Sequence, residues 1–267
     1  MSRPLLITQT SSGGSARLAA NWVSSLAALG IANGAVIFCT DSVALETLGN
    51  YCKAMAINAC CVQLTPREFA DSPEPGEHPY GTKYFIRYTL WKLDLLVRLS
   101  ERTPFEPFLF CDPDVVLLRD PVPALRGAAH LRSRGVSFWF ASDRPDDERP
   151  DPERGEYCTG VIYQNAPELD FWTLVYRWLS LRMPNTTDLD GSNFIHDQTA
   201  ANAVLIACHR RPGLLPVSLF RNGAQPWDGE PVLIHCNWAI GNDVKERRLR
   251  DSGLWFADDA VLLEVES

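Results

Sequence analysis

Two acidic residues two positions apart, Asp112 and Asp114, have the spacing in this 267-residue chain that most directly indicates chemistry. They follow the apolar run 108–111, and Pro113 between them lacks the N–H that a central strand needs, so the chain is expected to leave a sheet here. Two carboxylates at a strand end can share one divalent cation, and hard oxygen ligands suit Mg²⁺ or Mn²⁺. The alternative is a solvated turn, since Asp and Pro both favour turns. The second apolar run, 115–118, favours the metal site.

A histidine much later in the chain could complete the ligand set of that cation. His235 ends the apolar run VLIH, where a neutral imidazole at a strand end can bind a metal ion. Gly241 and Lys245 follow it; a glycine allows close approach of the backbone to a ligand, and a lysine supplies positive charge for a phosphate. The alternatives are a histidine satisfied inside the core and a lysine solvated on a basic helix.

A third polar pair, Asp197-Gln198, lies near the start of a predicted helix. A buried carboxylate or amide that faces a pocket could bind the hydroxyl groups of a sugar. The alternative is an ordinary acidic residue at a helix N-terminus, where the helix dipole favours negative charge.

The elements that must position these residues alternate between strands and helices. Residues 4–8 and 35–39 are predicted strands, and the helix between them has Ser15 as its candidate N-cap and Gly30 as its candidate C-cap. This order is typical of a parallel sheet, whose ligands bind beyond the carboxyl ends of the strands. Asp112 stands at such an end.

The rest of the chain continues the alternation. A charged, proline-rich stretch over 144–156 is interpreted as a mobile loop. Together the elements predict one α/β domain over residues 1–267, with a single Rossmann-like, mixed and mostly parallel sheet flanked by helices. The further predicted helices cover 43–56, 83–99, 169–181 and 195–207, and the further predicted strands cover 60–64, 108–111, 136–141, 157–163 and 232–236.

Charge and hydropathy exclude two classes of function. The formal net charge of −8 argues against non-specific binding to nucleic acid, which needs a basic surface. No apolar run approaches the eighteen or so residues of a membrane span, and residues 1–4 do not resemble a signal peptide. The chain is therefore predicted to be cytoplasmic as given, with the Golgi lumen as the alternative if an N-terminal anchor has been removed.

These motifs together resemble the nucleotide-diphospho-sugar transferases of glycosyltransferase family 77 and, more distantly, of family 8. The stretch 110–121 is similar to the DxDVVxLRDP segment of the family, and Thr159-Gly160 is similar to its NTG strand. Cys158 departs from that pattern, because the family usually has Asn there. The family's other segments are matched by Asn21-Trp22, Trp91-Lys92-Leu93, Asp197-Gln198, His235-Cys236-Asn237-Trp238, Gly241, Lys245 and Gly253-Leu254-Trp255.

The resemblance implies a GT-A fold and a transfer that retains the anomeric configuration. The donor would be a UDP-sugar that carries galactose, xylose, arabinose or glucose, the acceptor a glycan or glycoprotein hydroxyl, and the cofactor Mn²⁺ (or Mg²⁺). Residues to about 120 would form the nucleotide-binding half, and residues from about 121 the acceptor side.

The resemblance also implies site residues. The implied metal ligands are Asp112, Asp114 and His235. The implied neighbours of the UDP-sugar are Thr8, Gln9, Thr10 and Ser11 at the base, Arg87 or Lys92 at the phosphates or donor sugar, and Gly241 and Lys245 at the diphosphate. The implied catalytic residues, which face the sugars, are Asp197 and Gln198.

Two other functions compete with this one. Phosphohydrolases of the haloacid dehalogenase type also place Asp-x-Asp after an apolar strand, and residues 241–243 faintly resemble their late acidic loop. Their nucleophile strand, however, usually lies near the start of the chain, whereas several predicted strands and helices precede Asp112. A non-catalytic protein that binds sugar nucleotides is the second competitor, and Cys158 is the feature that favours it.

Overall fold

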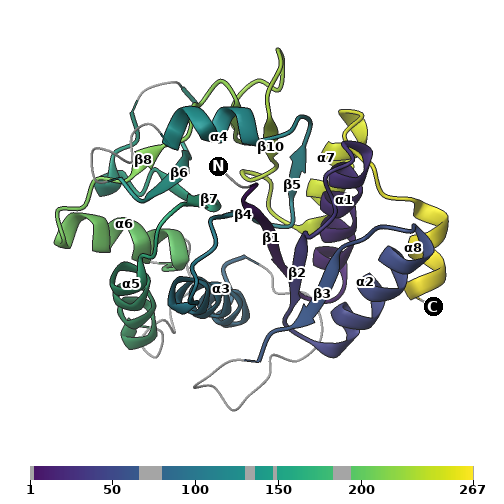
Figure 1. Cartoon of the computed structure of the whole chain (residues 1–267), viewed down its shortest axis with the longest axis horizontal. Helices are drawn as coiled ribbons and strands as arrows, with labels where there is room; N and C mark the ends of the chain where they lie inside the picture. The colour runs from purple at the N-terminus through teal and green to yellow at the C-terminus, as the bar shows by residue number, and fades with distance from the viewer. Residues whose placement is uncertain (1–2, 66–79, 130–135, 147–148, 183–193, 267) are drawn as a thin grey trace.

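The computed structural model of the chain describes residues 3–65, 80–129, 136–146, 149–182 and 194–266 (Figure 1). A seven-stranded sheet with the order β3-β2-β1-β4-β7-β6-β8 runs through its centre. Its strands are β1 (Leu5–Thr10), β2 (Val36–Cys39), β3 (Cys60–Gln63), β4 (Phe108–Cys111), β6 (Phe138–Ser142), β7 (Tyr157–Gln164) and β8 (Gly213–Leu214).

Neighbouring strands from β3 to β4 are parallel, whereas β7 runs antiparallel to both β4 and β6. The prediction of a mixed, mostly parallel α/β sheet is therefore confirmed. From β1 the chain builds the sheet outward through β2 and β3, and then returns to place β4 on the other side of β1. The order of the strands thus reverses between β1 and β4, and at such a point a crevice forms beyond the carboxyl ends of the strands.

Helices cover both faces of the sheet. One face packs against α1 (Gly14–Ala28), α2 (Ser42–Ala54) and α8 (Asp259–Glu266), and the other against α3 (Lys83–Glu101), α5 (Leu169–Arg182) and α6 (Asp197–Ala207). The helix α7 (Asn242–Asp251) lies beside α1, and α4 (Val122–Ala129) follows the strand β5 (Val115–Leu117) (Figure 1).

The alternation of side chains along β4 explains why its sequence is apolar throughout. Leu109 and Cys111 belong to the core on the α1 side, and Phe108 and Phe110 belong to the core on the α3 side. Because helices bury both faces of the sheet here, every position of β4 is apolar. The first polar residue that follows, Asp112, therefore marks the end of the sheet.

A second, three-stranded sheet brings distant parts of the chain together. It consists of β5 (Val115–Leu117), β10 (Leu233–His235) and β9 (Phe220–Arg221). The strands β5 and β10 are antiparallel, with His235 opposite Val115. The strand β10 lies within the predicted strand 232–236, whereas its pairing with β5 and β9 was not predicted. These strands have only two or three residues each, which is too short for a periodic pattern.

An ion network fixes the position of α7. The Arg17 guanidinium of α1 contacts Glu246 at 2.9 Å and Glu266 at 3.0 Å, and Arg250 contacts Glu246 at 2.8 Å and also Asp259. These groups are partly exposed, so each pair contributes little stability by itself. Together they connect α7 to α1 and α8, and α7 carries Lys245.

Several predicted boundaries need correction. Gly13, not Ser15, is the N-cap of α1, and Ser15 lies inside the first turn, where its hydroxyl is 2.9 Å from that of Thr10. Leu29 is the C-cap; Gly30 follows it with φ 69°, the left-handed conformation that favours glycine after a helix.

The stretch interpreted as a mobile loop contains a short 3₁₀ helix, η2 (Pro152–Arg154). Arg144 contacts both Asp146, at 2.6 Å, and Glu156, at 3.0 Å. In the parts of the chain that the structure describes, no helix is both long and apolar enough to cross a membrane.

Candidate active site

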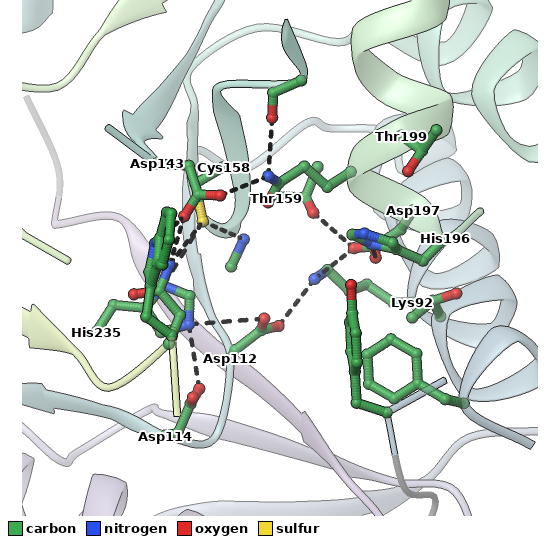
Figure 2. A pocket seen from close by; sticks show the side chains of 18 of the residues that line it. Lys92, Asp112, Asp114, Asp143, Cys158, Thr159, His196, Asp197, Thr199 and His235 are labelled. Atoms are coloured by element: carbon green, nitrogen blue, oxygen red, sulfur yellow. Dashed lines mark hydrogen bonds and ion pairs between the residues drawn. The ribbon is translucent and has the colours of Figure 1, made fainter. Parts of the chain in front are cut away.

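A cavity of about 850 Å³ opens beyond the carboxyl ends of β1 and β4 (Figure 2). Its volume lies in the range usual for small-molecule sites. Residues from both predicted halves of the chain line it, although the division near residue 120 stays a prediction. The predicted site residues that line it are Ser11, Lys92, Asp112, Asp114, Asp197, Gln198, His235, Gly241 and Lys245.

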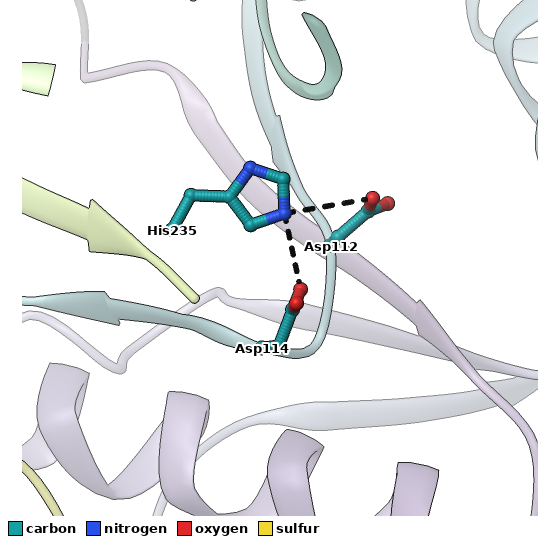
Figure 3. A group of neighbouring side chains, drawn as sticks. All are labelled: Asp112, Asp114 and His235. Carbon is teal, nitrogen blue, oxygen red and sulfur yellow. Dashed lines mark ion pairs between the residues drawn. The ribbon is translucent and has the colours of Figure 1, made fainter. Parts of the chain in front are cut away.

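Three of these residues, Asp112, Asp114 and His235, form a compact group of potential metal ligands, the metal group (Figure 3). The Nε2 atom of His235 is 3.2 Å from Oδ1 of Asp114 and 3.9 Å from Oδ2 of Asp112. One ligand atom of each residue lies within 4.8 Å of those of the other two. The pairing of β5 with β10 produces this arrangement, because the backbone N–H of Cys236 donates to the carbonyl of Asp114 at 2.9 Å.

The group fits a divalent cation in its chemistry and in the space around it. Two carboxylates and an imidazole are a donor set that Mn²⁺ accepts, and they leave further positions for phosphate oxygens. Gly160 of β7 makes the space, because a Cβ there would lie 2.1 Å from Cε1 of His235 and 2.8 Å from Oδ2 of Asp112.

A substitution at Gly160 tests this packing. We expect Gly160→Ala to lower the affinity for Mn²⁺ at least about tenfold, because the methyl group must displace the imidazole or the carboxylate, and small displacements around a metal typically cost 10–100-fold. Isothermal titration calorimetry measures the change. The matched control is Gly127→Ala in α4, where a Cβ meets no atom within 4 Å. Unchanged Mn²⁺ affinity in Gly160→Ala would show that metal binding does not need the space that Gly160 leaves beside His235 and Asp112.

Positive charge surrounds the buried Asp114. Its side chain is 3% exposed, and Nζ of Lys245 lies 2.8 Å from Oδ2. Burial would raise the pKa of Asp114, but the charges of Lys245 and His235 outweigh burial and hold that pKa well below its ordinary value. Burial lowers the pKa of His235, and the neighbouring Asp114 carboxylate raises it well above the ordinary value. Asp114 is therefore ionised and ready to bind a cation.

A buried lysine joins the metal group to the start of α6 (Figure 2). Nζ of Lys92 lies 2.9 Å from Oδ1 of Asp112 and 2.7 Å from Oδ2 of Asp197. Burial opposes the charge of Lys92, but the two carboxylates raise its pKa well above the usual range. The ammonium group is thus engaged by two carboxylates and holds them in place.

The pair Asp197-Gln198 lies at the first turn of α6, as the sequence predicts. Asp197 also accepts a hydrogen bond from the Thr159 hydroxyl at 2.7 Å and lies 3.2 Å from Nδ1 of His196. Burial would raise the pKa of Asp197, and Lys92 and His196 lower it well below its ordinary value. The amide nitrogen of Gln198 donates to Asp143 and to the carbonyl of Gly155, both at 2.9 Å.

Asp143 is a residue of the cavity that the sequence had not singled out. Its carboxylate accepts hydrogen bonds from Asn237 at 2.7 Å, from the Trp238 indole at 3.0 Å and from Gln198. Burial raises its pKa, and the hydrogen bond from Gln198 partly opposes this. The sequence offers one signal for Asp143 as a site residue: it directly follows the strand β6, as Asp112 directly follows β4.

Four predicted residues do not line the cavity. Thr8, Gln9 and Thr10 belong to β1 itself rather than to the loop after it, because β1 pairs with β2 through Thr10. The Gln9 amide nitrogen donates to the carbonyl of Tyr88 at 3.1 Å, and the Tyr88 hydroxyl donates to the carbonyl of Gln9 at 2.8 Å. Arg87 precedes Tyr88 on α3 and is likewise not part of the cavity wall. Their roles toward a nucleotide stay predictions.

Comparison with protein families matches residues 32–249 to the nucleotide-diphospho-sugar transferase model. Among curated proteins, UDP-D-xylose:L-fucose alpha-1,3-D-xylosyltransferase 1 of Arabidopsis thaliana is 27% identical over 205 residues, 68% of this chain and 54% of that protein. A second Arabidopsis protein of the same description is 27% identical over 207 residues, 69% of this chain and 53% of that protein. The chain thus spans about half the length of these relatives.

Two solved structures have a similar fold. The galactosyltransferase LgtC in complex with donor and acceptor sugar analogues has a TM-score of 0.60 at 12% identity, covering 98% of this chain and 100% of that one. Mouse xyloside xylosyltransferase 1 in its apo form has a TM-score of 0.53 at 12% identity, covering 88% of this chain and 98% of that chain. At this identity the similarity concerns the fold, and it confirms the GT-A class.

The family match bears on the competing functions. It covers the metal group, the start of α6 and most of α7 within one continuous stretch. The family is described as one of nucleotide-diphospho-sugar transferases, so the match does not support the phosphohydrolase alternative. The chain belongs to the nucleotide-diphospho-sugar transferase family.

Proposed function

We propose that this chain is a metal-dependent, retaining glycosyltransferase that moves a sugar from a UDP-sugar to a glycan or glycoprotein hydroxyl. The observation that carries the proposal is the group Asp112, Asp114 and His235 in the wall of a cavity large enough for a sugar nucleotide. The names of the Arabidopsis relatives make UDP-xylose the first donor to test, followed by UDP-galactose, UDP-arabinose and UDP-glucose.

Asp112, Asp114 and His235 would hold Mn²⁺ or Mg²⁺. When bound, the cation acts as a Lewis acid that neutralises charge on the leaving diphosphate. Lys245 adds a fixed positive charge on the same side of the cavity, and Gly241, with φ 99° at the start of α7, allows the diphosphate to approach the backbone.

Asp197 and Gln198 are proposed to face the sugars. Asp197 is ionised and immobilised by Lys92 and Thr159, so its negative charge lies at a fixed position beside the cavity. Such a charge stabilises positive charge that develops on the donor carbon, as carboxylates do in glycoside hydrolysis. Gln198 is oriented by its two amide hydrogen bonds. The proposal does not require a covalent intermediate.

A donor-hydrolysis screen tests the proposed function. Each of the four UDP-sugars is incubated with the protein and Mn²⁺, and released UDP is measured with and without EDTA. We expect hydrolysis of at least one donor, reduced at least about a hundredfold by EDTA, because the Lewis acid supplies several kcal/mol at the transition state. Turnover that is equal with and without EDTA would refute the metal dependence. Absence of turnover and of UDP-sugar binding would refute the donor class.

A further inference from the structure

The rim of the cavity carries an exposed tryptophan, Trp238, three residues after the metal-group histidine. Its side chain lines the cavity and is 62% exposed. A single exposed apolar side chain is ordinary, but exposed apolar surface that continues along a cavity rim is typical of a ligand-binding groove. Ile240, which is 72% exposed, continues the apolar surface along the same rim.

The other two tryptophans near the C-terminus are already covered. The guanidinium of Arg248 lies over the Trp227 ring, 4.2 Å from its centroid, and that of Arg250 lies over the Trp255 ring at 4.3 Å. Neither Trp227 nor Trp255 lines the cavity. Among the described residues, no aromatic ring and no cation packs against the Trp238 ring, so its faces are available to a ligand.

The surroundings of Trp238 hold the ring in one orientation. Its backbone has φ 62°, a conformation that a non-glycine residue adopts only where neighbouring contacts enforce it. The indole N–H donates to Oδ1 of Asp143 at 3.0 Å. Asn237 donates to the same oxygen at 2.7 Å and accepts from the backbone N–H of Gly223 at 2.6 Å. A preorganised ring loses little entropy when a ligand packs against it.

A second aromatic group lines the same cavity. Tyr80 is 49% exposed and packs edge-on against Phe194, with ring centroids 4.8 Å apart, and against Phe85 at 5.2 Å. Asp143 and Gln198 line the same cavity and provide polar groups there. Aromatic walls with a few polar groups suit a sugar ring, which has an apolar face of C–H groups and a rim of hydroxyls.

We propose that Trp238, held by Asp143, is the platform on which a saccharide acceptor stacks, and that the acceptor is therefore a sugar rather than a peptide hydroxyl. The inference rests on the proposed function and adds the substrate class of its acceptor. Trp238 is a specificity-determining residue in this arrangement, and Asp143 is a positioning residue that acts through it.

The test compares variants with UDP-xylose as donor and Mn²⁺ as metal. The acceptor probes are methyl α-L-fucopyranoside, methyl β-D-galactopyranoside, methyl β-D-xylopyranoside and a serine-containing peptide. For the best glycoside, Trp238→Ala is expected to raise the acceptor KM at least about tenfold, with a much smaller change in the KM for UDP-xylose, because a stacked aromatic ring is lost. Trp238→Phe keeps a ring but loses the bond to Asp143, so its acceptor KM should rise less.

Trp178→Ala is the matched control, since Trp178 lies on α5 against Arg182 and outside the cavity. Its acceptor KM should equal that of the wild type. Transfer to the peptide and to none of the glycosides would overturn the proposal, as would an acceptor KM in Trp238→Ala within twofold of the wild type. In both of these outcomes the wild type would still hydrolyse the UDP-sugar donor, so the proposed function would stand. Loss of UDP-sugar binding and hydrolysis in the wild type would instead refute the proposed function.

Discussion

Asp114→Ala is expected to reduce Mn²⁺-dependent turnover of a UDP-sugar by at least about a thousandfold, which corresponds to about 4 kcal/mol at the transition state. The substitution removes one ligand of the three-residue group and also the partner of both His235 and Lys245. Lys245 would then remain near the site without its carboxylate, so its positive charge would repel the incoming cation.

The measurement separates chemistry from folding. Released UDP gives the rate at saturating donor, calorimetry gives the Mn²⁺ affinity, and circular dichroism reports whether the variant is folded. Asp114→Asn preserves the size of the side chain and should show the same loss of Mn²⁺ affinity with a smaller effect on folding. Asp228→Ala is the control, because Asp228 is exposed and lies outside the cavity. More than a tenth of wild-type activity in folded Asp114→Ala would contradict the assignment of the metal group.

The second large effect concerns stability and arises at Lys92. Lys92→Met removes a buried cation from between two carboxylates while preserving most of the volume of the side chain. Removing one partner of a buried ion pair typically costs about 3–5 kcal/mol, because the remaining charge has no compensation. For a chain of this size, a loss of about 3–5 kcal/mol lowers Tm by roughly 6–15 °C. Activity should fall too, since Asp112 and Asp197 lose the group that positions them.

The effect of Lys92→Met should depend on pH in a defined direction. In the wild type, the lowered pKa of Asp197 contributes stability that is present above the unfolded pKa of about 4 and is lost as pH falls below it. Without Lys92, burial raises the pKa of Asp197, and burial already raises that of Asp112. Raised carboxyl pKa values favour the folded state at low pH and destabilise it as pH rises. The difference in stability between the two proteins should therefore shrink from pH 7 toward pH 4.

Thermal unfolding of both proteins without added metal, at several pH values, measures this effect. Lys53→Met on α2 is the control, since Lys53 is exposed and its loss should leave Tm unchanged. If Lys92→Met melted within 2 °C of the wild type at pH 7, the two carboxylates would not need Lys92. A difference that grew as pH fell would contradict the proposed charge states.

Much of this protein follows from its sequence. The runs of apolar residues within β1, β2, β4 and β7 were sufficient to predict strands at these places. Such runs are typical of strands that helices bury on both faces. The same logic located Asp112 and Asp114 at a strand end. The helix α6 was predicted over residues 195–207, and it begins two residues later, at Asp197, with His196 as its N-cap.

The tertiary structure decided which of the proposed groups meet. His235 follows Asp114 by 121 residues, and only the short pairing of β10 with β5 brings its imidazole within 3.2 Å of the carboxylate. Arg87 or Lys92 was expected at the phosphates or donor sugar, and that role stays a prediction. The tertiary structure places the Lys92 ammonium between Asp112 and Asp197. Asp143 belongs to the site because Gln198 of α6 and Asn237 of the loop after β10 donate hydrogen bonds to its carboxylate. Local patterns determine strands, helices and their ends, whereas the partner of a buried charge depends on contacts between segments far apart in the chain, which local patterns do not encode.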